Sequence, residues 1–545
     1  MPKFTPAELD AHRAKLAAAP RKRAIIKVGL NTCGDAAGAL PVYQAAKEAL
    51  QASGLDAQLV RTGCAGMCGL EPLVEVQVGS DPAVMYGRVN AEAMREIVAQ
   101  HVGQGKAVDA YRVPSIADMC CEPPTPGKQY RIVLRNCGVI DPESLDDYIA
   151  RDGYQALKQV LTQMTPEQVI AELEASGLRG RGGAGFPTFL KWKITRASRP
   201  GEQKYIICNG DEGDPGAYMD RSVLEGDPHS VIEGMIIGGW VIGASKGIFY
   251  IRAEYPLAVE RIEKAIRQAR AAGLLGSNIL GSGFDFDLEV RLGAGAFVCG
   301  EETALMASIE GKRGTPWPRP PYPAQKGLWG QPSMINNVET FANIPPIILR
   351  GGAWFGAIGI GRSKGTKVFA VTGKVKVSGL VEIPMGTTLR QVVEGICGGT
   401  PSGKPVKAVQ TGGPSGGLIP ASLLDTPISY EELAKLGSIM GSGGMIVMDE
   451  TDNTVELSRF YLDFSVDESC GKCAPCRIGG TQMLRVIDRV LAGKGTKQDI
   501  ATIKRIALTM QRGSLCALGQ TTPNPVLSSL KYFEHEWNER LVASK

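Results

Sequence analysis

A cluster of four cysteines near the C-terminal end constrains this chain more than any other feature. Cys470, Cys473 and Cys476 follow one another at three-residue spacing, and Cys516 comes 40 positions after the last of them. Two consecutive C-x-x-C steps wrap one polypeptide turn around three corners of an iron cube, and a remote cysteine supplies the fourth. Zinc more naturally uses two separated C-x-x-C knuckles or histidines, and the chain has only four histidines. The pattern therefore predicts a [4Fe–4S] cluster, with a metal-free cysteine group as the alternative.

A second group of cysteines lies near the N-terminus and consists of Cys33, Cys64 and Cys68. Thirteen cysteines could indicate a secreted disulfide protein, but the count is odd and the chain is 545 residues long, which is atypical of that class. The two groups indicate two modules, one at each end, that bind metal or formerly bound it.

The charge and hydropathy of the chain exclude several other classes. Sixty basic and 56 acidic residues leave a net charge of +4, which is too balanced for a chain that binds nucleic acid or a membrane surface throughout. The longest apolar stretch, residues 234–244, is shorter than the roughly 20 residues that cross a bilayer. The N-terminus lacks the apolar core of a signal peptide. We expect a soluble, cytoplasmic protein that does not insert into a membrane.

The order of apolar segments predicts an α/β chain of several domains. Strands at 24–30, 57–62, 73–78 and 84–88 with helices at 37–52 and 91–102 follow the order of a thioredoxin-like module, which we assign to residues 1–105. Residues 106–128 are rich in proline and glycine and are expected to be a linker. The remaining domains are a large α/β region at 129–355, a β-grasp-like domain at 364–440 (strands 367–372 and 379–383, helix 389–396), and a helical domain at 450–545 that carries the [4Fe–4S] cysteines, with helices at 454–468, 478–491, 497–511 and 526–539.

A glycine loop in the α/β region satisfies G-x-G-x-x-G with Gly180, Gly182 and Gly185. That fingerprint binds dinucleotides only after a strand, and here residues 165–175 begin with a capping-box pattern and continue at helical period. We therefore reject a Rossmann motif. The loop could still turn its backbone N–H groups towards a phosphate or a flat ring, with Arg181 and Lys191 supplying charge. The alternative is a plain flexible loop.

Three further motifs follow in the same region. An apolar strand at 205–208 ends in Asn209, Asp211, Glu212 and Asp214, and ligands of α/β sheets bind at such carboxyl ends. Carboxylates there suit ribose hydroxyls or a carboxamide, because they would repel phosphates; the alternative is a solvated acidic turn. The second of these motifs is another glycine loop, which leads into Glu301 and Glu302; these two could merely complement a helix dipole. The third is a segment that could line a cofactor slot or be a rigid loop, and it contains Arg319, Tyr322, Asn336, Asn337 and Thr340.

In this order the motifs closely resemble the flavoprotein subunit of NADH dehydrogenases, found in respiratory complex I, NAD-dependent formate dehydrogenases (as the beta subunit) and NAD-reducing or bifurcating hydrogenases. The resemblance covers residues 129–545, and a thioredoxin-like module of the family matches 24–100. It implies hydride transfer between NAD(H) and FMN, followed by single-electron transfer through [4Fe–4S] to partner subunits. The protein performs no acid–base chemistry of its own, because it aligns the two cofactors.

The resemblance also implies which residues bind the cofactors. Phe186 and Tyr322 sandwich the adenine of NADH with Arg319 close by, and Asp214 and Glu302 bind ribose or carboxamide groups. Several positions depart from the family pattern, which changes contact details but not the cofactor class: Phe297 stands for Tyr, Phe189 for Gly, Ile194 for an aromatic residue, Arg319 for Lys and Tyr322 for Phe. The implied FMN pocket consists of Gly180, Gly182, Lys191, Asn209, Asp211, Gly300, Glu301, Asn336, Asn337 and Thr340.

The N-terminal module of the family holds [2Fe–2S] with a C-x4-C pair and a C-x3-C pair. Cys64 and Cys68 supply the second pair and Cys33 one member of the first, but the missing partner falls at Val28, which cannot ligate iron. Either Asp35 or another residue takes its place, or the site is empty. Both alternatives stay open on the sequence.

No sequence signature for formate, hydrogen or quinone chemistry is visible. The resemblance therefore implies one component of a larger complex, with a small thioredoxin-like [2Fe–2S] subunit and a larger iron–sulfur or catalytic subunit as partners. The chain carries no further ferredoxin cysteines after residues 533–536, which favours a formate dehydrogenase-like or complex I-like assembly. Two other classes are alternatives, a non-catalytic electron relay or scaffold and a β-grasp ligand-binding protein. The glycine loops would have no role in either.

Overall fold

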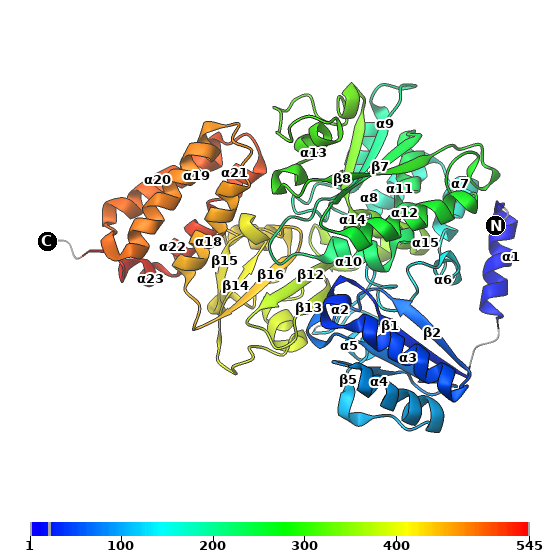
Figure 1. Ribbon diagram of the computed structural model, residues 1–545. Coiled ribbons are helices and arrows are strands. Elements are labelled where there is room, and N and C mark those ends of the chain that lie inside the picture. Colours follow the sequence, from blue (N-terminus) through cyan, green and yellow to red (C-terminus); the bar gives the residue numbers. More distant parts are fainter. Residues whose placement is uncertain (1–2, 20–22, 126, 543–545) are drawn as a thin grey trace.

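Two five-stranded sheets, a four-stranded sheet and a C-terminal group of helices dominate the structure (Figure 1). It is a computed structural model that describes residues 3–19, 23–125 and 127–542. The C-terminal helices lie at one end of the molecule, and the N-terminal sheet lies against the larger units at the other (Figure 1). The fold is a multidomain α/β fold, as the order of apolar segments predicts.

The N-terminal sheet has the strand order β2-β1-β3-β4-β5, in which only β1 and β2 are parallel. The helix expected at 37–52 is present as α3, and a short helix that was not expected, α2, precedes it. The two are separated at Gly38, whose φ of 97° suits glycine. Cys33 therefore lies in the first turn of a short helix. The elements are β1 (Ala24–Gly29), α2 (Thr32–Ala37), α3 (Ala39–Ser53), β2 (Ala57–Thr62), β3 (Val74–Val78), β4 (Val84–Tyr86), α4 (Ala91–Ile97, continued by a π-helical turn over Val98–Val102) and β5 (Arg112–Val113).

Two segments differ from the expected division of the N-terminal region. Part of the expected linker, residues 106–128, forms β5, which pairs with β4 and completes the sheet, and α5 (Ile116–Met119) follows it. The first helix, α1 (Pro6–Ala17), packs against the central unit and not against the N-terminal sheet, since the Phe4 N–H donates to the Ala272 carbonyl and Lys158 pairs with Asp10. Residues 1–105 therefore do not form one compact module.

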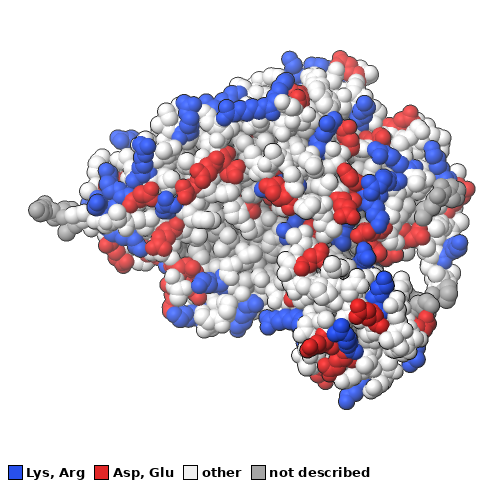
Figure 2. Space-filling view, in the orientation of Figure 1, with Lys and Arg blue, Asp and Glu red and all other residues white. Residues whose placement is uncertain are grey.

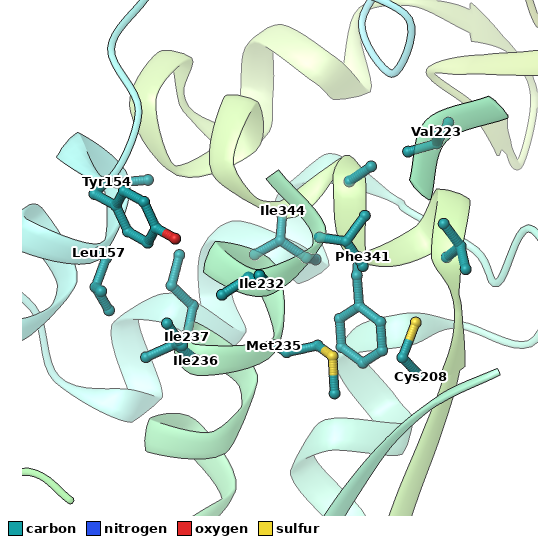
Figure 3. Packing of buried hydrophobic residues seen from close by; sticks show 14 of the residues in the cluster. Tyr154, Leu157, Cys208, Val223, Ile232, Met235, Ile236, Ile237, Phe341 and Ile344 are labelled. Atoms are coloured by element: carbon teal, nitrogen blue, oxygen red, sulfur yellow. The ribbon is translucent and has the colours of Figure 1, made fainter. Parts of the chain in front are cut away.

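The central unit is built on a parallel sheet of strand order β8-β7-β6-β9, so the carboxyl ends of its strands share one edge. The apolar stretch at 234–244 belongs to α11, a helix that is apolar on all sides because it is buried in the core. Figure 3 shows Met235 of this helix beside Phe341 of α14. The strands are β6 (Tyr205–Gly210), β7 (Lys246–Arg252), β8 (Asp287–Gly293) and β9 (Ser333–Asn337); the helices used below are α8 (Pro166–Ser176), α9 (Thr188–Ala197), α10 (Met219–Gly226), α11 (Pro228–Ile242), α12 (Pro256–Ala271), α13 (Glu302–Ile309) and α14 (Val338–Ala342).

A mixed sheet follows, with the order β13-β12-β16-β14-β15 and its own apolar core. Its central strands β12 and β16 run parallel, whereas the outer pairs are antiparallel. The helical segment expected at 389–396 is present, largely as a π-helical turn. The bounds are β12 (Thr366–Gly373), β13 (Gly379–Pro384), β14 (Val406–Thr411), β15 (Leu418–Pro420), α17 (Tyr430–Lys435) and β16 (Gly444–Asp449).

The C-terminal helices pack around a separate apolar cluster that includes Trp537. The second of them starts four residues earlier than expected, at Ala474, directly after the extended backbone of Cys473, and Pro475 suits its first turn. The last expected helix, 526–539, is two helices, since Phe533 has a non-helical backbone (φ −129°, ψ 38°). The bounds are α18 (Thr454–Asp467), α19 (Ala474–Arg489), α20 (Lys497–Gly513), α21 (Ala517–Thr521), α22 (Asn524–Tyr532) and α23 (Glu534–Asn538).

The surface agrees with the balanced composition. Basic and acidic side chains are mixed over the face drawn in Figure 2. Among the described residues, no helix is both long enough and apolar enough to span a bilayer.

Candidate functional site

The residues expected to bind the cofactor gather at the carboxyl edge of the parallel sheet, and we call this candidate site the pocket. Asn209 at the end of β6 and Asn337 at the end of β9 are register partners, and Asn336 pairs with Cys208 one position earlier. Asn209 donates from Nδ2 to the Gly300 carbonyl at 2.9 Å, which ties β6 to the second glycine loop. The sheet thus brings together residues that the sequence separates by more than 120 positions, at the edge where α/β sheets bind ligands.

The first glycine loop lies over this edge and is held from two sides. The Arg181 N–H donates to Thr340 Oγ1 at 2.9 Å, and Tyr430 Oη of the mixed-sheet unit donates to the Gly180 carbonyl at 2.9 Å. A Cβ on Gly182 would lie 3.2 Å from Cβ of Asn337, so the loop passes close to β9. The helix expected before the loop is α8, capped by Thr165. The absence of a preceding strand, which excludes the Rossmann motif, is confirmed.

Arg181 does not supply charge to a phosphate, contrary to the expectation from the sequence. Its side chain is completely buried. The guanidinium donates to the carbonyls of Thr366, Arg179 and Lys364 at 3.0, 2.9 and 2.6 Å. Arg181 therefore fastens the glycine loop to the start of the mixed sheet, and Thr340 is engaged in the same anchorage. Of the two expected cations, Lys191 alone reaches the pocket.

Asp211 is the most unusual group of the pocket. It is buried, and no hydrogen-bond donor within the described residues reaches either of its carboxylate oxygens. Burial raises the pKa of this carboxyl to about 7, an effect that Glu254 and Glu468 reinforce and Arg252 opposes. A Cβ on Gly300 would lie 3.3 Å from the Asp211 carbonyl oxygen, so the second glycine loop touches Asp211 directly. Buried acceptors without donors are rare in folded proteins, and this one suits a ligand that brings hydroxyl groups.

Glu301 and Glu302 have different roles at the start of α13. Glu301 caps the helix, because its Oε2 accepts the N–H groups of Thr303 and Ala304, each at 2.9 Å. Glu302 faces the pocket and pairs with Arg319 at 2.6 Å and with Lys191 at 3.7 Å. Lys191 also donates to the Ile335 carbonyl at 2.9 Å, in the middle of β9. The structure thus joins three of the expected residues in one ion-pair cluster.

Two aromatic side chains near this cluster are exposed. Phe186 is 44% exposed and lies 6.0 Å from the Lys191 ammonium, and Tyr322 is 54% exposed. Phe189 and Ile194, both departures from the family pattern, differ from each other: Phe189 packs against the main core, whereas Ile194 is 40% exposed. Exposed rings of this kind provide flat faces for a base.

The remaining expected residues are engaged with the protein. Asn336 accepts the indole N–H of Trp192 at 3.0 Å, and Asn337 caps α14 while donating to Asp220. Asp214 accepts a hydrogen bond from Ser442 of the mixed-sheet unit. Burial raises the pKa of Asp214 to about 6, and the Ser442 hydrogen bond opposes the shift.

The four C-terminal cysteines line a single small cavity, together with Val298, Pro316 and Lys472. Cys473 occupies the N-cap position of α19 and Cys476 lies in its first turn, so the positive end of this helix dipole faces the cavity. Within the described ranges, no three His, Cys, Asp or Glu side chains converge on the position of a single metal ion. The donor set, four cysteines around one space, fits a cubane cluster.

Three hydrogen bonds join the cysteine loops to the loops of the central unit. Glu468 Oε2 accepts the Phe297 N–H at 2.7 Å, and Arg313 donates to the Cys470 carbonyl at 3.1 Å. Lys472 donates to the Pro316 carbonyl at 2.6 Å. The pocket at the sheet edge and the cysteine cavity are therefore neighbours that share the segment from Phe297 to Gly300.

The N-terminal cysteines lie together against α10 of the central unit. Cys64 Sγ and Cys68 Sγ are 4.0 Å apart, and Arg221 of α10 donates to Cys33 Sγ at 3.4 Å. The thiol of Cys68 lies beside Cys33 and lowers the pKa of Cys33 to about 7. Val28, at the position of the missing cysteine, is buried inside the sheet.

Sequence reasoning missed four residues that shape these sites: Tyr430, Glu468, Arg221 and Asp220. Tyr430 and Arg221 act across units, and no local pattern reports such a contact. Glu468 carried a weak signal, since it lies two positions before Cys470, but its partner Phe297 is 171 positions away.

Comparisons with known proteins agree with this geometry. The Nuo51 FMN-binding domain family matches residues 173–346, and the NADH-ubiquinone oxidoreductase-F iron-sulfur binding region matches residues 456–540. The NADP-reducing hydrogenase subunit HndC of Solidesulfovibrio fructosivorans is 59% identical over 421 residues, which is 77% of this chain and 85% of that protein. The F subunit of the NADH-quinone oxidoreductase of Escherichia coli strain K12 is 39% identical over 73% of this chain and 89% of that protein.

A solved structure covers nearly the whole chain. A chain of the NAD+-reducing [NiFe]-hydrogenase in the H2-reduced state superposes with a TM-score of 0.68 and 28% identity, over 99% of this chain and 88% of that one. The extent and identity of the matches place the chain within a known family. The chain belongs to the family of flavoprotein subunits of NADH dehydrogenases, which includes the F subunit of NADH-quinone oxidoreductase and the hydrogenase subunit HndC.

Proposed function

We propose that this chain oxidises NADH, or reduces NAD+, with FMN, and exchanges single electrons with partner subunits through a [4Fe–4S] cluster. The observation that carries the proposal is the adjacency of two sites: a pocket with an unpartnered buried carboxylate, and a cavity lined by four cysteines. When bound, FMN supplies the two-electron to one-electron conversion that such a pair of sites requires.

The pocket residues fit FMN. Asp211 offers two acceptor oxygens that hydroxyl groups of a ribityl chain would satisfy, and the close approach at Gly300 and Gly182 leaves room only for backbone. We assign FMN contacts to Gly180, Gly182, Lys191, Asn209 and Asp211. Gly300, Asn336 and Asn337 complete the pocket, while Glu301 and Thr340 shape it through α13 and the glycine loop.

The nicotinamide nucleotide is assigned to the outer side of the same pocket. Phe186 and Tyr322 present exposed rings to the adenine, and Arg319 stands close to the nucleotide through its ion pair with Glu302. Glu302 and Asp214 accept hydrogen bonds from ribose hydroxyls or the carboxamide. The side chains bind and orient the nucleotide; none transfers a proton.

We further propose the finer division of the fold: a thioredoxin-like N-terminal unit, an FMN- and NADH-binding unit at 129–355, a β-grasp unit at 364–440 and a helical [4Fe–4S] unit at 450–545. The chain works in a larger redox complex with a small [2Fe–2S] subunit and a larger catalytic subunit, on the cytoplasmic side of the cell.

In the N-terminal unit, Cys33, Cys64 and Cys68 are the ligands of a [2Fe–2S] cluster whose fourth ligand is not a cysteine. The 4.0 Å between Cys64 Sγ and Cys68 Sγ suits two thiolates on one iron.

A non-catalytic electron relay is the second candidate function, because it would need the cysteines but not the pocket. The unpartnered Asp211 argues against it, since a relay would have no use for a costly buried carboxylate. The test is an anaerobic purification of the full chain with assays for flavin and iron, followed by addition of NADH. Bleaching of bound flavin by NADH supports the enzyme; iron without flavin would leave only the relay.

A further inference from the structure

Glu468 connects the cysteine side of the molecule to the wall of the flavin pocket. It follows the last residue of α18 and lies two positions before Cys470. Its Oε2 accepts the backbone N–H of Phe297 at 2.7 Å. Phe297 opens the short helical turn that ends at Gly300, and Gly300 touches Asp211. A side chain from the cluster-bearing segment therefore holds the loop that closes the pocket.

The Phe297 side chain is fixed by the same helix. Its ring packs edge-on against Phe464 with 5.4 Å between the centroids. Phe464 in the last turn of α18 and Glu468, the residue that caps its C-terminal end, are four positions apart, so both lie on the same side of the helix end. On its other side the ring meets Gly213, where an added Cβ would lie 2.7 Å from Phe297 Cδ2. Helix α18 thus holds both the backbone and the ring of Phe297.

The other two hydrogen bonds between the cysteine loops and the central unit do not reach the pocket wall. Arg313 and Lys472 meet carbonyls of Cys470 and Pro316, on the side of the cavity. Glu468 is also close enough to Asp211 to help raise its pKa. Of these three bonds, the one made by Glu468 acts on the segment between the two proposed redox sites.

We propose that Glu468 is a positioning residue for electron transfer, because it fixes the separation and orientation of the flavin pocket relative to the cluster cavity through Phe297. The inference rests on the proposed function, which places FMN in the Asp211–Gly300 pocket and a cluster between the four cysteines. Small misplacements of reacting groups are costly even when the mutated residue is remote from them.

The test uses the full-length holoprotein with three substitutions that separate charge from geometry. Glu468→Gln keeps an acceptor oxygen and removes the charge, Glu468→Asp keeps the charge and withdraws the acceptor, and Glu468→Ala removes both. Glu456→Gln and Glu456→Ala, at an exposed glutamate of the same helix, are the matched controls. FMN and iron contents are measured first, and cluster reduction by NADH is then followed by stopped flow and freeze-quench EPR.

Glu468→Ala and Glu468→Asp should slow cluster reduction about 10- to 100-fold relative to reduction of FMN by NADH, while Glu468→Gln and both controls keep the wild-type ratio. Redox titration should show a raised cluster potential in Glu468→Gln and Glu468→Ala only, since both lose a nearby negative charge. The inference is overturned if Glu468→Asp transfers electrons at the wild-type rate, or if Glu468→Gln is as slow as Glu468→Asp. Both comparisons remain possible even if Glu468→Ala does not fold. Wild-type protein without flavin or iron would instead refute the proposed function.

Discussion

A buried carboxylate without a donor, such as Asp211, costs the folded protein free energy until a ligand supplies hydrogen bonds. Proteins accept such a cost where binding needs it, and perturbed acidic groups accordingly concentrate at functional sites. In the flavin-free chain this cost appears as a raised pKa, because burial disfavours the charged carboxylate: the pKa of Asp211 is about 7, against an ordinary value of 3.8. The Asp211 side chain therefore affects both the stability of the flavin-free protein and the binding of the ligand.

Asp211→Asn should remove a pH dependence from the stability of the flavin-free protein. A raised folded-state pKa means that the folded chain holds a proton that the unfolded chain has released, so Asp211 costs little below about pH 4 and its cost grows until about pH 7. The loss is on the order of a few kcal/mol, and Asn does not titrate. We expect the variant to gain Tm over the wild type at about pH 8 but not at about pH 4. A Tm difference that does not vary with pH would contradict this account.

Glu302→Gln should weaken nicotinamide binding more than FMN retention. The substitution removes the ion pairs with Arg319 and Lys191 and leaves a weaker acceptor for the nucleotide, a loss of roughly 1–3 kcal/mol. We expect KM for NADH to rise about tenfold or more, with FMN content unchanged after gel filtration. Unchanged NADH kinetics would refute the role assigned to Glu302.

At the scale of elements, the glycine loop depends on a tyrosine from another unit. Tyr430→Phe removes the hydrogen bond to the Gly180 carbonyl, worth about 1 kcal/mol. The loop should then hold FMN about fivefold more weakly, measured by flavin fluorescence on dilution. Tyr532→Phe, which removes a similar bond to the Leu436 carbonyl away from the pocket, is the control and should retain FMN as the wild type does.

The cysteine at the start of α19 allows a prediction about electron transfer from the cluster to partner subunits. Cys473 occupies the N-cap position of this helix and lines the cysteine cavity, and it lies outside the flavin pocket. Cys473→Ala should abolish electron transfer to partner subunits while NADH still bleaches bound FMN. If correctly folded variant protein with normal FMN content no longer accepts hydride, the separation of the two sites is wrong.

The sequence predicts elements well where local signals dominate and less well where contacts between units decide. The capping box at Thr165 and the alternating strands of the N-terminal sheet are local signals, and those elements are present where expected. The short helix α2 and the short strand β5 were not predicted, because six residues of helix and two residues of strand carry little periodicity. The cysteine cavity follows from spacing alone, whereas the anchoring of Gly180 by Tyr430 depends on tertiary packing that no motif encodes.

At the scale of the whole molecule, the units that carry the proposed sites follow one another from the N-terminal sheet, through the central unit, to the helices at the other end (Figure 1). The iron content tests this arrangement. Two clusters predict about six iron atoms per chain, four plus two, and one cluster about four. We expect six, and Cys64→Ser should remove the second cluster's EPR signal from the reduced protein. A four-iron protein with wild-type activity would show that the N-terminal unit carries no cluster.

Helix α10 has a consequence for how the two ends of this series respond to each other. One turn of it bears Asp220, bonded to Asn337 at the flavin pocket, and Arg221, bonded to Cys33, and Glu212 fixes that turn by accepting both backbone N–H groups. If binding at one of the two sites changes the affinity of the other through this shared turn, the coupling is reciprocal. Any change at the N-terminal cysteines that tightens flavin binding by some factor must itself be favoured by bound flavin by the same factor. With such coupling, the occupancy of either site would change the affinity of the other.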